Sequence, residues 1–142
     1  MKIGICSDHA GVEYKARLCA YLERKGYEVR DFGTDSTQSC DYADFAHPMA
    51  CAIENGECQC GIAICGTGNG MAITLNHHRA IRAGLAWGTA IAALVKQHNN
   101  ANVLVLPARF ISYNMAVSCV RTWLTAEFEG GRHQRRIDKI PV

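Results

Sequence analysis

Residues 65–70 read Cys-Gly-Thr-Gly-Asn-Gly and follow an apolar run typical of a buried strand. Glycines at alternate positions allow the backbone to curl tightly, so that successive N–H groups converge on one concavity. A helix expected to start at Met71 would direct the positive end of its dipole there. The segment therefore predicts a small anion site. A plain strand-to-helix turn is the structural alternative, but three glycines beside a cysteine favour the anion site.

Cys65 is the candidate reactive group of this segment. The positive end of the following helix would favour its thiolate, and a thiolate can accept a proton. A buried structural cysteine is the alternative, and it is what we expect for the other seven cysteines. Met71 stands where a third glycine would complete a dinucleotide fingerprint, which argues against that class of site.

The remaining cysteines do not suggest a metal centre or a redox pair. Cys58 and Cys60 are separated by a single residue, and no second Cys or His pair accompanies them at zinc-site spacing. Cys65 lacks the C-x-x-C partner of a thiol redox protein. We therefore expect neither a metal nor another cofactor.

Cations that could hold the far end of a phosphorylated substrate lie elsewhere in the sequence. Arg132 and Arg136 are four residues apart in an expected short helix after two glycines, and Arg109 follows an expected strand. A solvated tail is the alternative for the two C-terminal arginines. Titratable groups are also found at the end of the first expected strand, at Asp8 and His9, and before the last one, at His98.

Composition limits the class of protein. The chain has 142 residues, 49% of them apolar, which fits a single domain with a hydrophobic core. The 15 Lys and Arg against 13 Asp and Glu are interspersed, so neither nucleic acid nor a membrane surface is an expected partner. No apolar run reaches the roughly 18–20 residues of a membrane span. The N-terminus lacks a signal-peptide pattern, which predicts a cytoplasmic protein with reduced thiols.

The elements expected to position these residues alternate between strand and helix. Such alternation, with several strands apolar on both faces, predicts one α/β domain over residues 1–142, with a parallel sheet of about five strands between helices. Ligands of such sheets bind beyond the carboxyl ends of the strands. The expected strands are residues 3–6, 27–32, 61–65, 81–87 and 102–106. Two helices are expected to span residues 41–55 and 89–97, and four more are expected to begin at residue 12, at residue 71, after Ser112 and after residue 131.

Several segments, taken in order, resemble the type B ribose-5-phosphate isomerases, in the family that also contains galactose-6-phosphate isomerase subunits. The resemblance covers nearly the whole chain and rests on residues 6–11, 41–42, 64–70, 82–83, 97–99, 102–104 and 129–136. It implies a Rossmann-like three-layer α/β/α sandwich. It also implies a homodimer, with a tetramer as the alternative, whose active sites lie at the subunit interface, on which segment 130–142 docks.

The resemblance further implies metal-free interconversion of ribose 5-phosphate and ribulose 5-phosphate, a step of the non-oxidative pentose phosphate pathway. Cys65 matches the base that moves a proton between C2 and C1, and His98 matches the acid that opens the furanose ring. One branch of the family has Glu after the glycine loop, where this chain has Met71, which leaves Cys65 as the base. The other matching residues are Gly66, Thr67, Gly68, Asn69 and Gly70 at the enediolate, Asp8, His9, Tyr42 and Asn99 at the sugar, and Arg109, Arg132 and Arg136 at the phosphate.

Two alternatives remain at this level. A six-carbon substrate, allose 6-phosphate or galactose 6-phosphate, would use the same chemistry. A non-catalytic sugar-phosphate sensor would use the same anion pocket but would need neither Cys65 nor His98.

Overall fold

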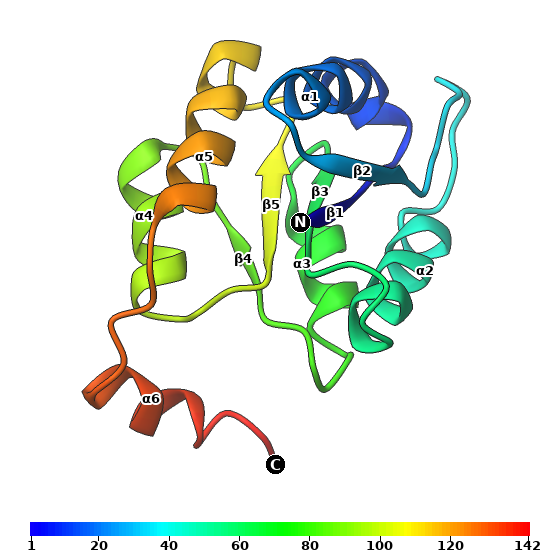
Figure 1. Ribbon diagram of the computed structural model, residues 1–142. Coiled ribbons are helices and arrows are strands. Elements are labelled where there is room, and N and C mark those ends of the chain that lie inside the picture. Colours follow the sequence, from blue (N-terminus) through cyan, green and yellow to red (C-terminus); the bar gives the residue numbers. More distant parts are fainter.

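A computed structural model describes residues 1–142 and contains one five-stranded sheet in which every neighbouring pair of strands is parallel (Figure 1). The strand order is β2-β1-β3-β5-β4. This arrangement confirms the predicted open parallel sheet. The strands are β1 (Lys2–Ser7), β2 (Glu28–Asp31), β3 (Cys60–Cys65), β4 (Ala83–Leu85) and β5 (Val103–Pro107).

Helices cover both faces of the sheet, as expected of a Rossmann-like three-layer sandwich (Figure 1). None of them combines the length and apolarity that a membrane span would require. They are α1 (Val12–Arg24), α2 (Ala43–Glu54), α3 (Asn69–Leu75), α4 (Thr89–Gln97), α5 (Tyr113–Thr125) and α6 (Arg132–Ile137), with a 3-10 turn, η1 (His9–Gly11), before α1.

Two hydrophobic clusters, one on each face, explain why β1, β3 and β5 are continuously apolar. Side chains alternate along a strand, so Ile3 and Ile5 pack with Trp123 of α5 on one face, whereas Cys6 packs with Met49 of α2 on the other. Both layers exclude water from these strands. The central sheet is therefore a rigid platform for the loops at its ends.

The predicted elements are present, with limits that differ by one or a few residues. Strand 27–32 is observed as Glu28–Asp31, helix 41–55 as Ala43–Glu54, and the helix expected from Met71 begins at Asn69. The largest difference is β4, which has three residues instead of the seven predicted. β4 is an edge strand, and the Asn76 side chain donates to Ala83 O (3.0 Å) and accepts from Ala83 N (2.8 Å), so a side chain replaces a neighbouring strand there.

A buried ion pair joins α1 to the end of β2. The side chain of Lys15 is 2% exposed, and its Nζ donates to Asp31 Oδ2 (2.5 Å) and Asp35 Oδ1 (3.1 Å). Burial alone would lower the pKa of Lys15, but the hydrogen bonds to the two carboxylates outweigh it and the pKa is raised. The ammonium thus remains charged in the interior and fixes the loop that follows β2.

The order of the strands determines where a ligand can enter. The chain leaves β1 for β2 through α1 and later reaches β3 through α2, and these helices pack on opposite faces. A crevice therefore opens between the carboxyl ends of β1 and β3. Asp8 follows β1, and Cys65 ends β3, so these two predicted site residues lie on opposite sides of this crevice.

Candidate functional site

Asp8 is held rigidly at the crevice. Its backbone N–H donates to Ile64 O (3.1 Å), which ties the end of β1 to β3. Its carboxylate Oδ1 accepts a hydrogen bond from Ala10 N (2.9 Å) and so caps the 3-10 turn η1. The residue is only 7% exposed. A carboxylate fixed in this way can orient a sugar hydroxyl without having to be ordered by the ligand.

Cys65 lies directly across the crevice and is 4% exposed. Its side chain belongs to the cluster that contains Cys6 and Met71. Complete burial, reinforced by the negative charge of Asp31, raises the pKa of Cys6, so that thiol stays protonated. Of these two cysteines, therefore, Cys65 is the one placed to react, because it stands at the start of the glycine loop.

The glycine loop needs glycine at specific positions. Gly68 has φ +80°, in the left-handed region, and a Cβ there would lie 2.3 Å from Leu85 Cδ1. Thr67 Oγ1 accepts from Asn69 N (3.2 Å) and steadies the curl. A Cβ on Gly66 would lie 3.3 Å from Arg109 Cδ, so the arginine side chain crosses the loop.

Two side chains from outside the loop lie on the same edge of the sheet. A Cβ on Gly70 would lie 2.5 Å from Tyr42 Cζ, which places the tyrosine ring directly over the loop. His9 Nδ1 accepts from Cys40 N (3.3 Å), and the Cys40 thiol lies 3.8 Å from the same nitrogen. The segment before α2 therefore folds back over the carboxyl edge. Cys40 was not predicted as a neighbour of His9.

The other predicted site residues lie at the opposite edge. α4 begins after the carboxyl end of β4 and runs back to the amino edge, where β5 starts, so His98 and Asn99 lie at that amino edge. In Figure 1 the arrowhead of β5 points away from α6, which carries Arg132 and Arg136 at the same amino edge. Within one chain, therefore, Cys65 and His98 are not brought together.

His98 has two close neighbours that were not predicted. Its ring stacks on that of His133, with centroids 4.1 Å apart and an angle of 12° between the planes. Glu129 Oε1 lies 3.8 Å from His98 Nε2 and 3.4 Å from His133 Nε2. The pKa of His133 is lowered, chiefly by burial and then by repulsion from His98 and Arg132. His133 itself is buried and only 5% exposed.

A cavity of about 300 Å³ opens beside these histidines. It is bounded by His98 and Asn99 at the end of α4 and by α6 and the residues after it. Three of the predicted site residues therefore share it, namely His98, Asn99 and Arg136. Its lining is completed by His133, Ile137 and Ile140.

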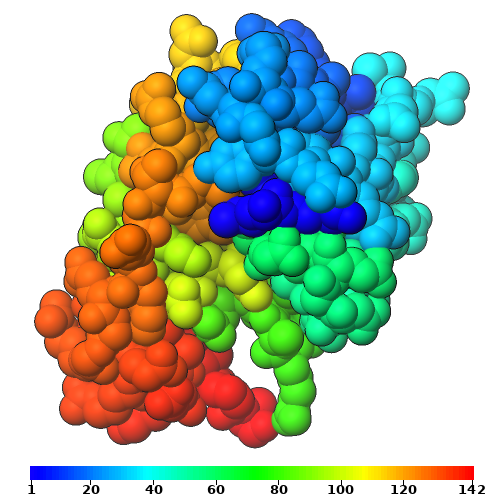
Figure 2. Space-filling model, viewed as in Figure 1, coloured from blue at the N-terminus to red at the C-terminus, as the bar shows by residue number.

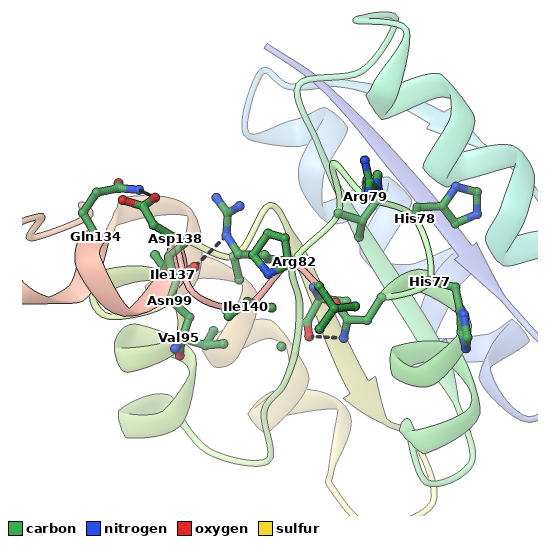
Figure 3. Close-up of a pocket in the computed structure, with 17 residues that line it drawn as sticks. His77, His78, Arg79, Arg82, Val95, Asn99, Gln134, Ile137, Asp138 and Ile140 are labelled. Atoms are coloured by element: carbon green, nitrogen blue, oxygen red, sulfur yellow. Dashed lines mark hydrogen bonds between the residues drawn. The ribbon is translucent and has the colours of Figure 1, made fainter.

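A larger cavity of about 930 Å³ lies nearby and is bounded on one side by the C-terminal segment (Figure 3). Figure 2 shows the surface hollowed between the red C-terminal segment and the green segment that projects beside it. Arg82 lies in this hollow, and its Nε donates to Asn99 O (3.0 Å). Cys65 and His98 do not line it, so we assign it no part in the reaction.

The residues predicted for a sugar-phosphate site are divided between these two edges, and sequence comparison identifies the family of the chain. A family model described as Ribose/Galactose Isomerase matches residues 3–140. The chain belongs to this family. Ribose-5-phosphate isomerase B of Escherichia coli strain K12 is 41% identical over 139 residues, which cover 98% of this chain and 93% of that relative.

Solved structures of this isomerase family share the fold over nearly their whole length. Ribose-5-phosphate isomerase B of Clostridium thermocellum has a TM-score of 0.97 at 46% identity, over 99% of this chain and 95% of that one. The Mycoplasma genitalium ribose-5-phosphate isomerase B, solved with bound ribulose-5-phosphate, has a TM-score of 0.93 at 42% identity, over 98% of this chain and 93% of that one. The predicted resemblance and fold are confirmed.

Proposed function

We propose that this isomerase interconverts ribose 5-phosphate and ribulose 5-phosphate through an enediolate, with Cys65 as the base. The observation that carries the proposal is the position of Cys65, at the end of a buried strand and the start of a tightly curled glycine loop. The Escherichia coli and Clostridium thermocellum relatives bear the name ribose-5-phosphate isomerase B, and the Mycoplasma genitalium structure holds ribulose-5-phosphate.

The reaction needs one group that moves a proton and another that stabilises negative charge. The Cys65 thiolate removes the C2 proton of the open-chain aldose, and the electron pair forms the C1–C2 double bond while O1 becomes an oxyanion. Backbone N–H groups of residues 66–70 are the donors proposed for that oxyanion. A proton then moves from the O2 hydroxyl to O1, and the thiol returns its proton to C1, which leaves a carbonyl at C2 and gives the ketose. The near-complete burial of Cys65 keeps bulk water from the exchanging proton.

We further propose that a second copy of the chain completes each site. His98 is assigned to opening of the furanose ring, and Arg132 and Arg136 to binding of the phosphate, yet all three lie at the edge opposite Cys65. A two-fold dimer in which the two chains lie antiparallel would bring the amino edge of each subunit to the carboxyl edge of its partner. Segment 130–142 would then dock on the partner subunit. Arg132 and Arg136 of α6 are both exposed in the single chain, which fits this role.

Sugar specificity and location complete the proposal. A five-carbon substrate is favoured by the names of the relatives, whereas the family description also includes galactose isomerases. All eight cysteines are free, as expected in a reducing compartment, and we propose the cytoplasm.

The test is an aldose–ketose assay with ribose 5-phosphate, allose 6-phosphate and galactose 6-phosphate in parallel, on the native chain and on Cys65→Ala. We expect the five-carbon substrate to be preferred and kcat of Cys65→Ala to fall about a thousandfold. Cys6→Ala, which changes a buried thiol of the same cluster, is the matched control and should keep its turnover. A folded chain that binds these sugars but converts none of them would be a sensor instead. Preference for a six-carbon sugar would correct the substrate alone.

A further inference from the structure

The group formed by His98, Glu129 and His133 has the composition of a transition-metal site. Its three ligand atoms all lie within 4.8 Å of one another, and no other group of three His, Cys, Asp or Glu side chains in the chain does so. Two imidazoles and one carboxylate are the protein ligands of many open, four-coordinate zinc sites. The three side chains come from the end of α4, from the segment before α6 and from α6.

An unsatisfied atom points to a missing ligand in this cluster. The side chain of His133 is 6% exposed, and its Nε2 is fully buried without a hydrogen-bond partner. A buried polar atom without a partner costs about 1–3 kcal/mol, so such atoms are rare and call for an explanation. The nearest acceptor is Glu129 Oε1 at 3.4 Å, which faces the same space as His98 Nε2.

The two separations from Glu129 are close to those around a tetrahedral ion. Ligands about 2.0–2.1 Å from Zn²⁺ at tetrahedral angles are about 3.3 Å apart. The observed separations from Glu129 Oε1 are 3.4 Å to His133 Nε2 and 3.8 Å to His98 Nε2. Stacked rings direct their lone pairs along parallel lines, so His98 must tilt toward the ion. It is 38% exposed and stands at the C-terminal end of α4, where it has room to tilt.

We infer that His98, Glu129 and His133 bind a borderline divalent metal such as Zn²⁺ or Co²⁺, and that bound metal inhibits the enzyme. Imidazole ligands favour such ions over Mg²⁺ or Ca²⁺, which prefer oxygen. Binding requires both histidines to be neutral, and the lowered pKa of His133 favours that form. The nearby positive charges of Arg132 and Arg136 oppose a cation, so a reversible rather than a permanently filled site is expected.

Inhibition follows from the ligand set, and this step rests on the proposed role of His98. An imidazole nitrogen that holds a metal cannot donate a proton to the furanose ring oxygen. Metal binding itself does not depend on that role. The closely spaced Cys58 and Cys60 are poor ligands at neutral pH, because burial raises the pKa of Cys60 to about 11 and also raises that of Cys58.

The test is titration of the metal-free, full-length protein with Co²⁺, followed by visible absorption, together with isomerase assays in Zn²⁺ and after added chelator. We expect tetrahedral ligand-field bands without a thiolate-to-cobalt charge-transfer band, and inhibition that chelator reverses. Glu129→Gln and His133→Gln should each weaken Co²⁺ binding by at least about 100-fold. His77→Gln, which changes an exposed histidine outside the cluster, should leave both binding and turnover unchanged.

Each result bears on a different part of the inference. A strong charge-transfer band, or equal affinity in Glu129→Gln and the native chain, would assign the metal to other groups and overturn the site. Glu129 is half exposed, so its substitution should leave the fold intact even if that of buried His133 does not. Tight cobalt binding without loss of turnover would overturn the inhibition. Absence of turnover in metal-free protein that still binds cobalt would refute the isomerase proposal instead.

Discussion

Complementation between two inactive variants tests the shared site directly. Cys65→Ala removes the base at the carboxyl edge, and His98→Asn removes the ring-opening group at the amino edge. If each site combines the carboxyl edge of one subunit with the amino edge of the other, neither pure dimer has a complete site. A mixed dimer has one complete site and one that lacks both groups.

The expected recovery follows from this geometry. Equal amounts of the two variants, unfolded and refolded together, give mixed dimers in about half of the population, each with one working site of two, so about a quarter of native activity returns. The separate variants should retain only about 1/100 to 1/10,000 of it. The assay is conversion of ribose 5-phosphate by the refolded mixture, with mixed dimers counted by native mass spectrometry, since the variants differ in mass.

Mixing the native chain with the double variant Cys65→Ala/His98→Asn is the matched control. Shared sites leave the mixed dimer without any complete site, so only native dimers, about a quarter of the population, are active. Sites contained within one chain would instead retain about one half. The two-chain site would be refuted if, with mixed dimers present, the first mixture recovered no activity and the second retained about one half of native activity.

Three further outcomes test the described contacts. Gly70→Ala should change the free energy of unfolding by no more than about 1 kcal/mol, since alanine favours the helix. It should lower kcat/KM about tenfold, because the new Cβ displaces Tyr42. Urea denaturation and kinetics measure the two effects separately, and parallel losses of stability and activity would count against the contact. Lys15→Met should cost about 1.5–3 kcal/mol in urea denaturation at neutral pH. Because the pKa of Lys15 is raised above 10.5, this difference should persist to that pH and shrink only above it, and a difference that already fades at neutral pH would contradict the ion pair. The lowered pKa of His133 means that the folded state binds its proton less readily, so metal-free protein should lose stability as pH falls below 6.5. His133→Gln should reduce this dependence of the melting temperature on pH. An unchanged dependence would assign it to other groups.

The strands of the central sheet could be predicted from sequence because burial on both faces leaves a clear pattern. β1, β3 and β5 are fully or almost fully buried, and each appears as a short apolar run that ends at a polar or glycine-rich turn. The length of β4 was overestimated because the apolar residues Ile81, Ala86 and Trp87 lie around it, whereas the contact of Asn76 with Ala83 marks its start. Positions at the carboxyl ends of strands, such as Asp8 and Cys65, followed directly from the fold class.

The division of the site between two edges was implied only by the resemblance, although the sequence contained a signal for it. His98 precedes a predicted strand rather than following one, and a residue before a parallel strand lies at the amino edge. The partnership of His98 with Glu129 and His133 had no such signal. It depends on how the C-terminal segment crosses the end of α4, where Glu129 N donates to Gln97 O (3.0 Å), and local sequence does not encode that path.

Only a few buried side chains attach α6 to the rest of the molecule, which separates its stability from that of the sheet. The helix has six residues and buries only His133 and Ile137, whereas the central strands β1, β3 and β5 are almost entirely buried. Opening this short helix exposes little apolar surface, so its amide hydrogens exchange through local fluctuations that leave the sheet folded. Ligands that order α6 must supply that conformational entropy from their own binding energy. We therefore expect the last segment of the chain to be a separate cooperative unit, whose order is set by what binds to its arginines.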